Sequence, residues 1–86
     1  PEPMDKLLAK LAQYLQNDLP TPDVVVATVK DVETQASRSS ANDRMLRDAG
    51  GIQMLVHMIP EFDALTPIVN QVLTTLHVLV RLNPRN

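Results

Sequence analysis

Few side chains in this sequence could combine into a reactive site. His57 and His77 are the only two histidines, and the helix pattern of the chain places them on different helices. Cysteine is absent from the sequence, which excludes a disulfide scaffold, a thiolate zinc site and a cysteine nucleophile. Glu61 and Asp63 fall in an expected loop, where two carboxylates without a pocket make no acid–base centre. The sequence therefore predicts no enzymatic activity, no cofactor and no metal site.

Length and composition indicate one small domain over residues 1–86. Eight basic and ten acidic residues leave a formal net charge of −2, which disfavours binding of nucleic acid through a strongly basic surface. Hydrophobic residues make up 44% of the chain but aromatic ones only 2%, so the core must be aliphatic. Residues 1–20 do not resemble a signal peptide, and polar side chains interrupt the uncharged stretch 64–80, unlike a membrane span. We therefore expect a protein of the cytoplasm or nucleus.

Prolines and a glycine pair divide the chain into five expected helices. Thr-Pro at 21–22 and at 66–67 each suit a helix start, because the hydroxyl can cap a first-turn amide and Pro needs no hydrogen-bond partner there. Ser40 and Asp43 have the spacing of a capping box, and Gly50-Gly51 predicts a sharp turn. The expected helices cover about 5–17, 22–37, 42–48, 52–59 and 67–82, with loops at 38–41 and 60–65.

Apolar residues at helical spacing predict the buried face of each long helix. In the first half these rows are Leu7, Leu8, Leu11 and Leu15, and then Val25, Val29, Val32 and Ala36. In the second half they are Ile52, Leu55, Val56 and Ile59, and then Leu65, Ile68, Val69, Val72, Leu73, Leu76, Leu79 and Val80. The β-branched run at 24–26 also fits a strand, but the Thr-Pro start and the spacing of the row favour a helix.

A shift of 44 positions superimposes the rows of the two halves. Leu11 then falls on Leu55, and Val29 falls on Leu73. A helical repeat of about 40–47 residues is typical of HEAT and armadillo solenoids. Two unrelated amphipathic helix pairs can also be aligned in this way, so a compact bundle of four to six helices, such as a death-domain-like module, is the alternative fold.

The segment from 42 to 59 resembles an armadillo repeat. The family has an Ala-Gly-Gly-Ile turn, found here at 49–52, and a second helix that Leu55, Val56 and Ile59 match. Residues 72–79 fit the pattern of its long third helix. The resemblance covers 42–84 as a full repeat, and residues 5–38 look like the last two helices of a degenerate preceding repeat. It implies an all-α fold, a right-handed α-solenoid fragment of about two armadillo-like repeats.

The resemblance also implies a function, because solenoids bind partners on the concave surface that successive third helices form. We expect a non-enzymatic interaction module that binds a peptide segment or a neighbouring domain. The candidate partner-binding residues are Lys30, Thr34, Arg38, Thr74, Val78 and Arg81. Many peptide-binding members carry an Asn at the position of Val78, and some nuclear-import adaptors carry a Trp at that of Thr74, so the resemblance does not extend to their peptide clamp. A solvated helix face is the alternative interpretation of these residues.

Met54 and Met58 lie away from the apolar row of their helix, which makes that helix apolar nearly all round. Such a helix is normally buried. The two methionines therefore either pack inside the fragment or face a neighbouring repeat, a dimer mate or another partner. The alternative function is an oligomerisation or assembly domain that uses its open solenoid ends, either as a homodimer or against neighbouring repeats of a larger chain.

Overall fold

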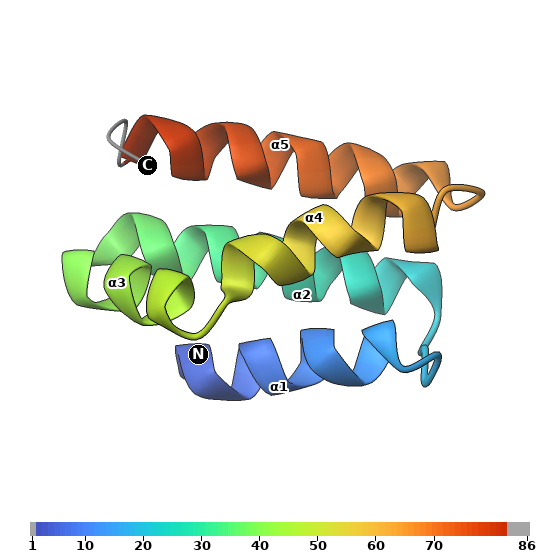
Figure 1. Ribbon diagram of the computed structural model, residues 1–86, viewed down its shortest axis with the longest axis horizontal. Helices are drawn as coiled ribbons and strands as arrows, with labels where there is room; N and C mark the ends of the chain where they lie inside the picture. The colour runs from blue at the N-terminus through green and yellow to red at the C-terminus, as the bar shows by residue number, and fades with distance from the viewer. Residues whose placement is uncertain (1, 83–86) are drawn as a thin grey trace.

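Five α-helices make up most of residues 2–82, which confirms the predicted all-α class (Figure 1). The computed structural model describes residues 2–82. The helices are α1 (Met4–Leu15), α2 (Pro22–Arg38), α3 (Ser40–Asp48), α4 (Gly51–Glu61) and α5 (Thr66–Leu82). Each predicted helix is present, with bounds that differ by one or two residues. The predicted end of the second repeat, residue 84, lies outside the described residues.

The start of α3 differs by one position from the predicted capping box. Ser39, not Ser40, is the N-cap, and its hydroxyl accepts a hydrogen bond from the Asn42 backbone N–H at 3.0 Å. Asp43 does not complete a capping box, because its two carboxylate oxygens each lie 3.1 Å from Nε of Arg47. The helix therefore begins two residues earlier than expected.

The two Thr-Pro pairs do begin the long helices, but without the predicted hydroxyl caps. Thr21 is the N-cap of α2 and Pro22 follows at the first helical position, yet the Thr21 side chain makes no capping hydrogen bond. Thr66 already belongs to α5, and the backbone carbonyl of Leu65 accepts the first hydrogen bonds of that helix. The predicted N-cap at Thr66 is therefore wrong by one residue.

Both predicted loops are shorter than expected. A single residue separates α2 from α3, and α4 continues through Pro60. Pro60 has no N–H, so the carbonyl of Val56 loses its helical hydrogen bond. Val56 is 50% exposed, and water can satisfy that carbonyl instead. Two residues further on, the helical hydrogen bond from the Phe62 N–H to the Met58 carbonyl is intact at 3.0 Å.

The glycine pair makes the predicted sharp turn between α3 and α4. Gly50 has φ of 78°, a left-handed conformation that glycine adopts without steric cost. Gly51 is required for a different reason, which is lack of space. A Cβ at Gly51 would lie 2.2 Å from Cδ1 and 2.8 Å from the backbone oxygen of Leu46. This close approach of the two helices leaves no room for a side chain.

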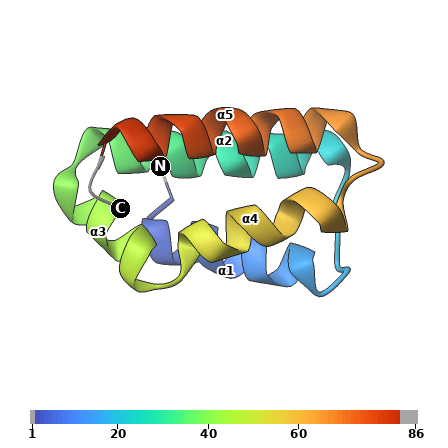
Figure 2. The same cartoon turned by 45° about the horizontal axis from the view of Figure 1, so that its top comes forward.

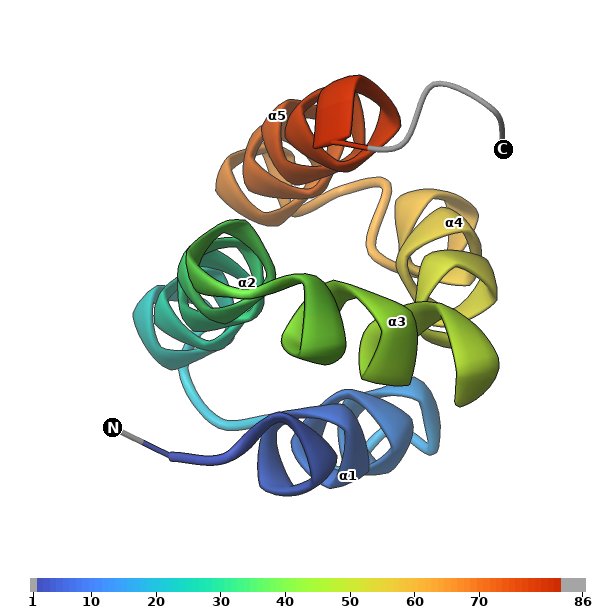
Figure 3. The same ribbon diagram turned by 90° about the vertical axis from the view of Figure 1, so that its left-hand side faces the viewer.

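The helices form two layers, with α3 at one end. The helix pairs in contact include α1 with α4, α2 with α5, and the antiparallel neighbours α1 with α2 and α4 with α5. In Figure 1, α1 and α4 run in one direction, and α2 and α5 run in the opposite direction. Figure 2 shows α5 alongside α2 and α4 alongside α1, and the end-on view in Figure 3 shows α3 crossing the end of both layers.

The core between α1 and α2 follows the predicted rows closely. The buried side chains of these two helices are Met4, Leu7, Leu8, Leu11, Tyr14, Val25, Thr28, Val29, Val32 and Ala36. Tyr14 and Thr28 are the polar members. Their hydroxyls lie 3.0 Å apart, and the Thr28 hydroxyl also donates to the Val24 carbonyl at 2.9 Å. Each buried hydroxyl therefore has a partner, which removes the cost of burying it.

The buried face of α5 is rotated relative to the prediction. Its buried residues are Ile68, Val72, Thr75 and Leu79. Leu73 and Val80 were expected in the core but are 50% and 62% exposed. The difference arises because α2 lies against the side of α5 that carries Thr75, and this contact moves the centre of the buried face toward Thr75.

On α4 the predicted inward position of Val56 is wrong, because Val56 is 50% exposed. Met58, which lies off the predicted apolar row, is completely buried, so it adopts the first of its two expected environments and packs inside the fragment. Met58, Leu55 and Phe62 form one face at spacings of three, four and seven residues. Ile52, Met54 and Ile59 are half-buried at the edges of this face and pack against the core.

Candidate functional site

The six predicted partner-binding residues lie on two parallel neighbouring helices. Five of them are exposed, three on α2 and two on α5, and the sixth is half-buried on α5. Helices α2 and α5 share the most extensive helix–helix contact of the described chain, and they lie side by side in Figures 1 and 2. The two rows therefore border one continuous surface. We call this surface the α2–α5 face: Lys30, Thr34, Arg38, Thr74, Val78 and Arg81.

A partly buried polar network joins the two helices beside this face. The Thr75 hydroxyl donates to Oε1 of Glu33 at 2.8 Å, and Thr75 is completely buried. Nε2 of Gln71 donates to the Thr75 hydroxyl at 3.1 Å and lies 3.5 Å from the same Glu33 oxygen. Hydrogen bonds to an ionised carboxylate are about twice as strong as neutral ones. The network therefore holds α2 and α5 in one relative register.

Val78 lies on the same side of α5 as the residues of this network. It follows Gln71 by seven residues and Thr75 by three, so all three occupy one side of α5. That side faces α2, because Gln71 and Thr75 both reach Glu33. Val78 is half-buried rather than fully exposed. It therefore lies toward the junction between the two rows, and its apolar side chain is flanked by the polar and basic members of the face.

The sequence analysis did not identify Glu33, Gln71 or Thr75. In the sequence, Thr75 is a polar residue between the apolar positions of its helix. Its spacing to Val72 and Leu79 is nevertheless that of a buried helix face. Threonine is acceptable in a helical core when its hydroxyl has a partner. Nothing in the sequence indicates that Glu33 supplies that partner across 42 residues.

Arg47 fixes the far end of α5. Its Nε binds the Asp43 carboxylate on α3, and its Nη2 donates to the Leu79 carbonyl at 2.6 Å. Leu79 is in the last turn of α5, where carbonyls lack helical partners and a positive charge is favourable. The guanidinium therefore ties α3 to the end of α5 and supports the half of the face that contains Arg81.

The residues considered for catalysis or metal binding do not gather around a pocket. His57 is exposed on α4 and His77 is exposed on α5, while Glu61 and Asp63 are exposed at and after the end of α4. Within residues 2–82, no three His, Cys, Asp or Glu side chains are arranged to hold a metal ion.

The two methionines predicted for self-association occupy different environments. Met58 is completely buried among the core residues, so it presents no surface to a partner. Met54 is half-buried and packs against the same core. The most exposed large apolar residues of α4 and α5 are instead Val56, Leu73 and Val80. These three residues, and not the two methionines, are the exposed apolar side chains that an apolar contact on α4 and α5 would involve.

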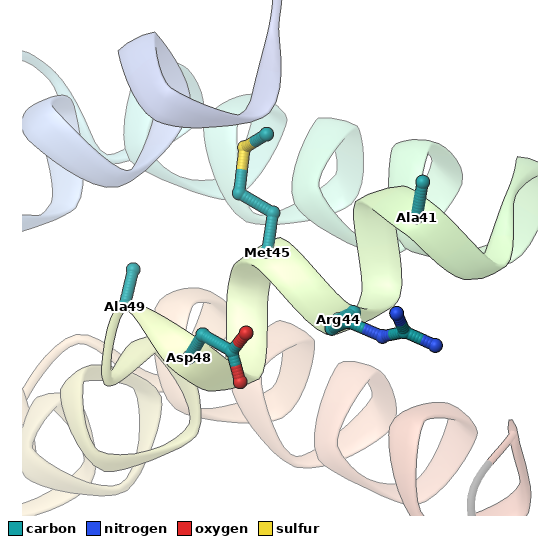
Figure 4. A pocket seen from close by; sticks show the side chains of 5 residues that line it. All are labelled: Ala41, Arg44, Met45, Asp48 and Ala49. Carbon is teal, nitrogen blue, oxygen red and sulfur yellow. The ribbon is translucent and has the colours of Figure 1, made fainter.

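Two open hollows lie away from the α2–α5 face. One, of about 510 Å³, lies along α3, where three apolar side chains point to the same side of the helix (Figure 4). It is lined by Ala41, Arg44, Met45, Asp48 and Ala49. The other is at the turn between α1 and α2 and includes Lys10 and Tyr14. Lys10 donates a hydrogen bond to the exposed carboxylate of Glu2. This hydrogen bond, and the negative charge of the Glu2 carboxylate, raise the pKa of Lys10. Both hollows are open to solvent, and neither brings reactive groups together.

No helix within residues 2–82 has the length and apolar character needed to cross a membrane. The chain matches no model of a known protein family, no curated protein and no solved structure.

Proposed function

We propose that this chain is a non-enzymatic protein–protein interaction module of the cytoplasm or nucleus. It is an armadillo-like α-solenoid fragment of two repeats, and it binds a segment of a partner protein, or a neighbouring domain, across the α2–α5 face. The observation that carries the proposal is the parallel packing of α2 and α5, which aligns their exposed rows into one surface.

The helix contacts support the repeat arrangement. Residues 44 positions apart lie on α1 and α4, or on α2 and α5, and these are pairs of helices that touch. Equivalent helices of successive repeats touch in this way when each repeat stacks on the one before it.

The charges of the face indicate the chemistry of the partner. Lys30, Arg38 and Arg81 are exposed cations, whereas the nearby Glu33 carboxylate is engaged by Thr75 and Gln71. A partner segment with acidic side chains would therefore be attracted to the face. Such attraction acts mainly on specificity and on the rate of association. Half-buried Val78 would contribute an apolar contact between the cationic rows.

Binding can be tested without knowing the natural partner. Peptides selected against the chain from a random phage-displayed library would be synthesised, and their affinities measured by isothermal titration calorimetry. The test variant is Lys30→Glu/Arg38→Glu, and the control is Lys6→Glu/Arg44→Glu. The control makes the same change in net charge at exposed cations of α1 and α3.

Each exposed ion pair contributes about 0.2–1 kcal/mol, and charge reversal replaces attraction by repulsion. We therefore expect the Lys30→Glu/Arg38→Glu variant to lose about tenfold in affinity, or about 1.4 kcal/mol, with its helix content unchanged. The control should lose less than twofold. Equal affinities for the two variants would remove the basic row from the proposed binding surface.

A further inference from the structure

The outer side of α3 carries a short apolar row that is open to solvent. Ala41, Met45 and the C-cap residue Ala49 follow one another at intervals of four, so they form one ridge of the helix. All three are exposed, and Met45 is 46% exposed. Figure 4 shows their side chains on one side of α3, along the hollow of about 510 Å³. Water therefore contacts an apolar ridge that a second helix can cover.

Two opposite charges lie beside this ridge. Arg44 and Asp48 are exposed and four residues apart, and Figure 4 shows both side chains projecting from the side of α3 next to the ridge. Within residues 2–82 neither forms an ion pair, whereas Asp43 and Arg47 of the same helix pair with each other. The ridge is therefore flanked on one side by an exposed cation and an exposed anion.

This pattern is complementary to itself when the helix is reversed. A two-fold axis perpendicular to α3, at the level of residue 46, sets a second α3 antiparallel to the first and brings the same flanks of the two helices together. Arg44 then faces Asp48 of the other copy, because the two positions are equally far from the axis on opposite sides, and the symmetry makes this pair twice. The two Met45 side chains lie about 3 Å apart along the helix, at a rise of 1.5 Å per residue. Self-complementary patches of this kind are what a two-fold dimer requires.

We propose that this side of α3 binds the same side of α3 in a second copy of the chain. The two Met45 side chains pack together, and two ion pairs between Arg44 and Asp48 flank them. Methionine adapts its shape to such a contact, and the small side chains of Ala41 and Ala49 let the two backbones approach closely. The nine residues of α3 cover less than the roughly 800 Å² per partner of a standard interface, so the dimer is weak and depends on concentration.

Exchange of the two charges tests the contact. Sedimentation equilibrium at low salt, from about 10 µM to 1 mM, measures the dissociation constant while screening is weak. The test variants are Arg44→Asp and Asp48→Arg, studied separately and as an equimolar mixture. Both changes suit the helix dipole, because the new anion lies nearer the N-terminus and the new cation lies in the last turn. The controls Lys30→Asp and Asp31→Arg make the same charge changes at exposed positions of α2.

We expect Arg44→Asp and Asp48→Arg each to weaken the dimer at least tenfold, because each replaces two ion pairs by two like-charge contacts. The mixture should associate within threefold of the original chain, since each variant supplies the charge that the other lacks, and each control should change the dissociation constant less than threefold. An original chain that stays monomeric at about 1 mM would overturn the inference. So would test variants that dimerise like the original chain, or a mixture that fails to associate.

A thiol probe gives a second measurement. Because the sequence has no cysteine, oxidation of a Met45→Cys variant should link two copies through thiols that lie near the two-fold axis. We expect this linkage to be at least tenfold faster than that of Val80→Cys, which replaces a side chain that is 62% exposed on α5. Faster linkage of Val80→Cys would place the contact between copies on α5 and refute pairing through α3. None of the α3 residues belongs to the α2–α5 face, so the inference does not depend on the proposed function.

Discussion

The rotated face of α5 yields a sharp prediction, because two leucines of one predicted row occupy different environments. Leu79 is 0% exposed and Leu73 is 50% exposed. Replacing a fully buried Leu by Ala costs about 2–5 kcal/mol, from lost burial plus the cavity that remains. Because Leu79 lies in the last turn of α5, we expect about 3 kcal/mol for Leu79→Ala. Leu73→Ala removes the same atoms from a half-exposed site that leaves no closed cavity. At about 0.8 kcal/mol per buried carbon group, its cost is about 1 kcal/mol.

Urea unfolding followed by circular dichroism measures both variants, because the free energy of unfolding falls linearly with denaturant. The chemical change is the same in both variants and both sites are in one helix, so helix propensity cancels in the comparison. A loss from Leu73→Ala as large as that from Leu79→Ala would show that Leu73 is covered, and would refute the packing described for α5.

Two further substitutions test local features of the fold. Ser39→Ala removes the hydroxyl that caps α3 and should lower the free energy of unfolding by about 1 kcal/mol, whereas Ser40→Ala should change it by less than about 0.5 kcal/mol; a larger effect at Ser40 would restore the predicted capping box. Thr75→Val keeps the shape of the side chain but deprives Glu33 of its closest hydrogen-bond donor, and should cost about 1–2 kcal/mol. An unchanged or raised stability of the Thr75→Val variant would show that the network does not hold α2 and α5 together.

The sequence predicts the number, order and approximate bounds of the helices. Proline and glycine make the helix bounds predictable. The fixed φ of proline and the conformational freedom of glycine act locally and do not depend on the rest of the fold. The left-handed turn at Gly50 is an example. The capping residues are less predictable, because Ser39 and Ser40 are chemically equal and only the path of the chain decides between them.

The buried faces are predicted where a helix is enclosed and missed where it is not. The row at 25, 29, 32 and 36 is correct because α2 has neighbours on several sides. On α5, the apolar pattern covers a wider arc than its two neighbouring helices can bury, so sequence alone cannot say which edge stays exposed. The tertiary contact between Thr75 and Glu33 determines which edge of α5 is buried.

The α2–α5 face is predicted only as a set of exposed positions. Helical spacing places Lys30 and Arg38 on one side of α2, and the structure adds that this row lies beside that of Thr74 and Arg81. The half-burial of Val78 was not predicted, because it depends on how closely α2 approaches α5.

The measurement that tests this proposal most directly is the change in backbone amide chemical shifts when a selected peptide is added to the ¹⁵N-labelled chain. Binding across the α2–α5 face predicts that the largest changes fall on α2 around Thr34 and on α5 around Val78, with α1 nearly unchanged. Changes concentrated on α1 and α3, with Thr34 and Val78 unaffected, would contradict the proposed site.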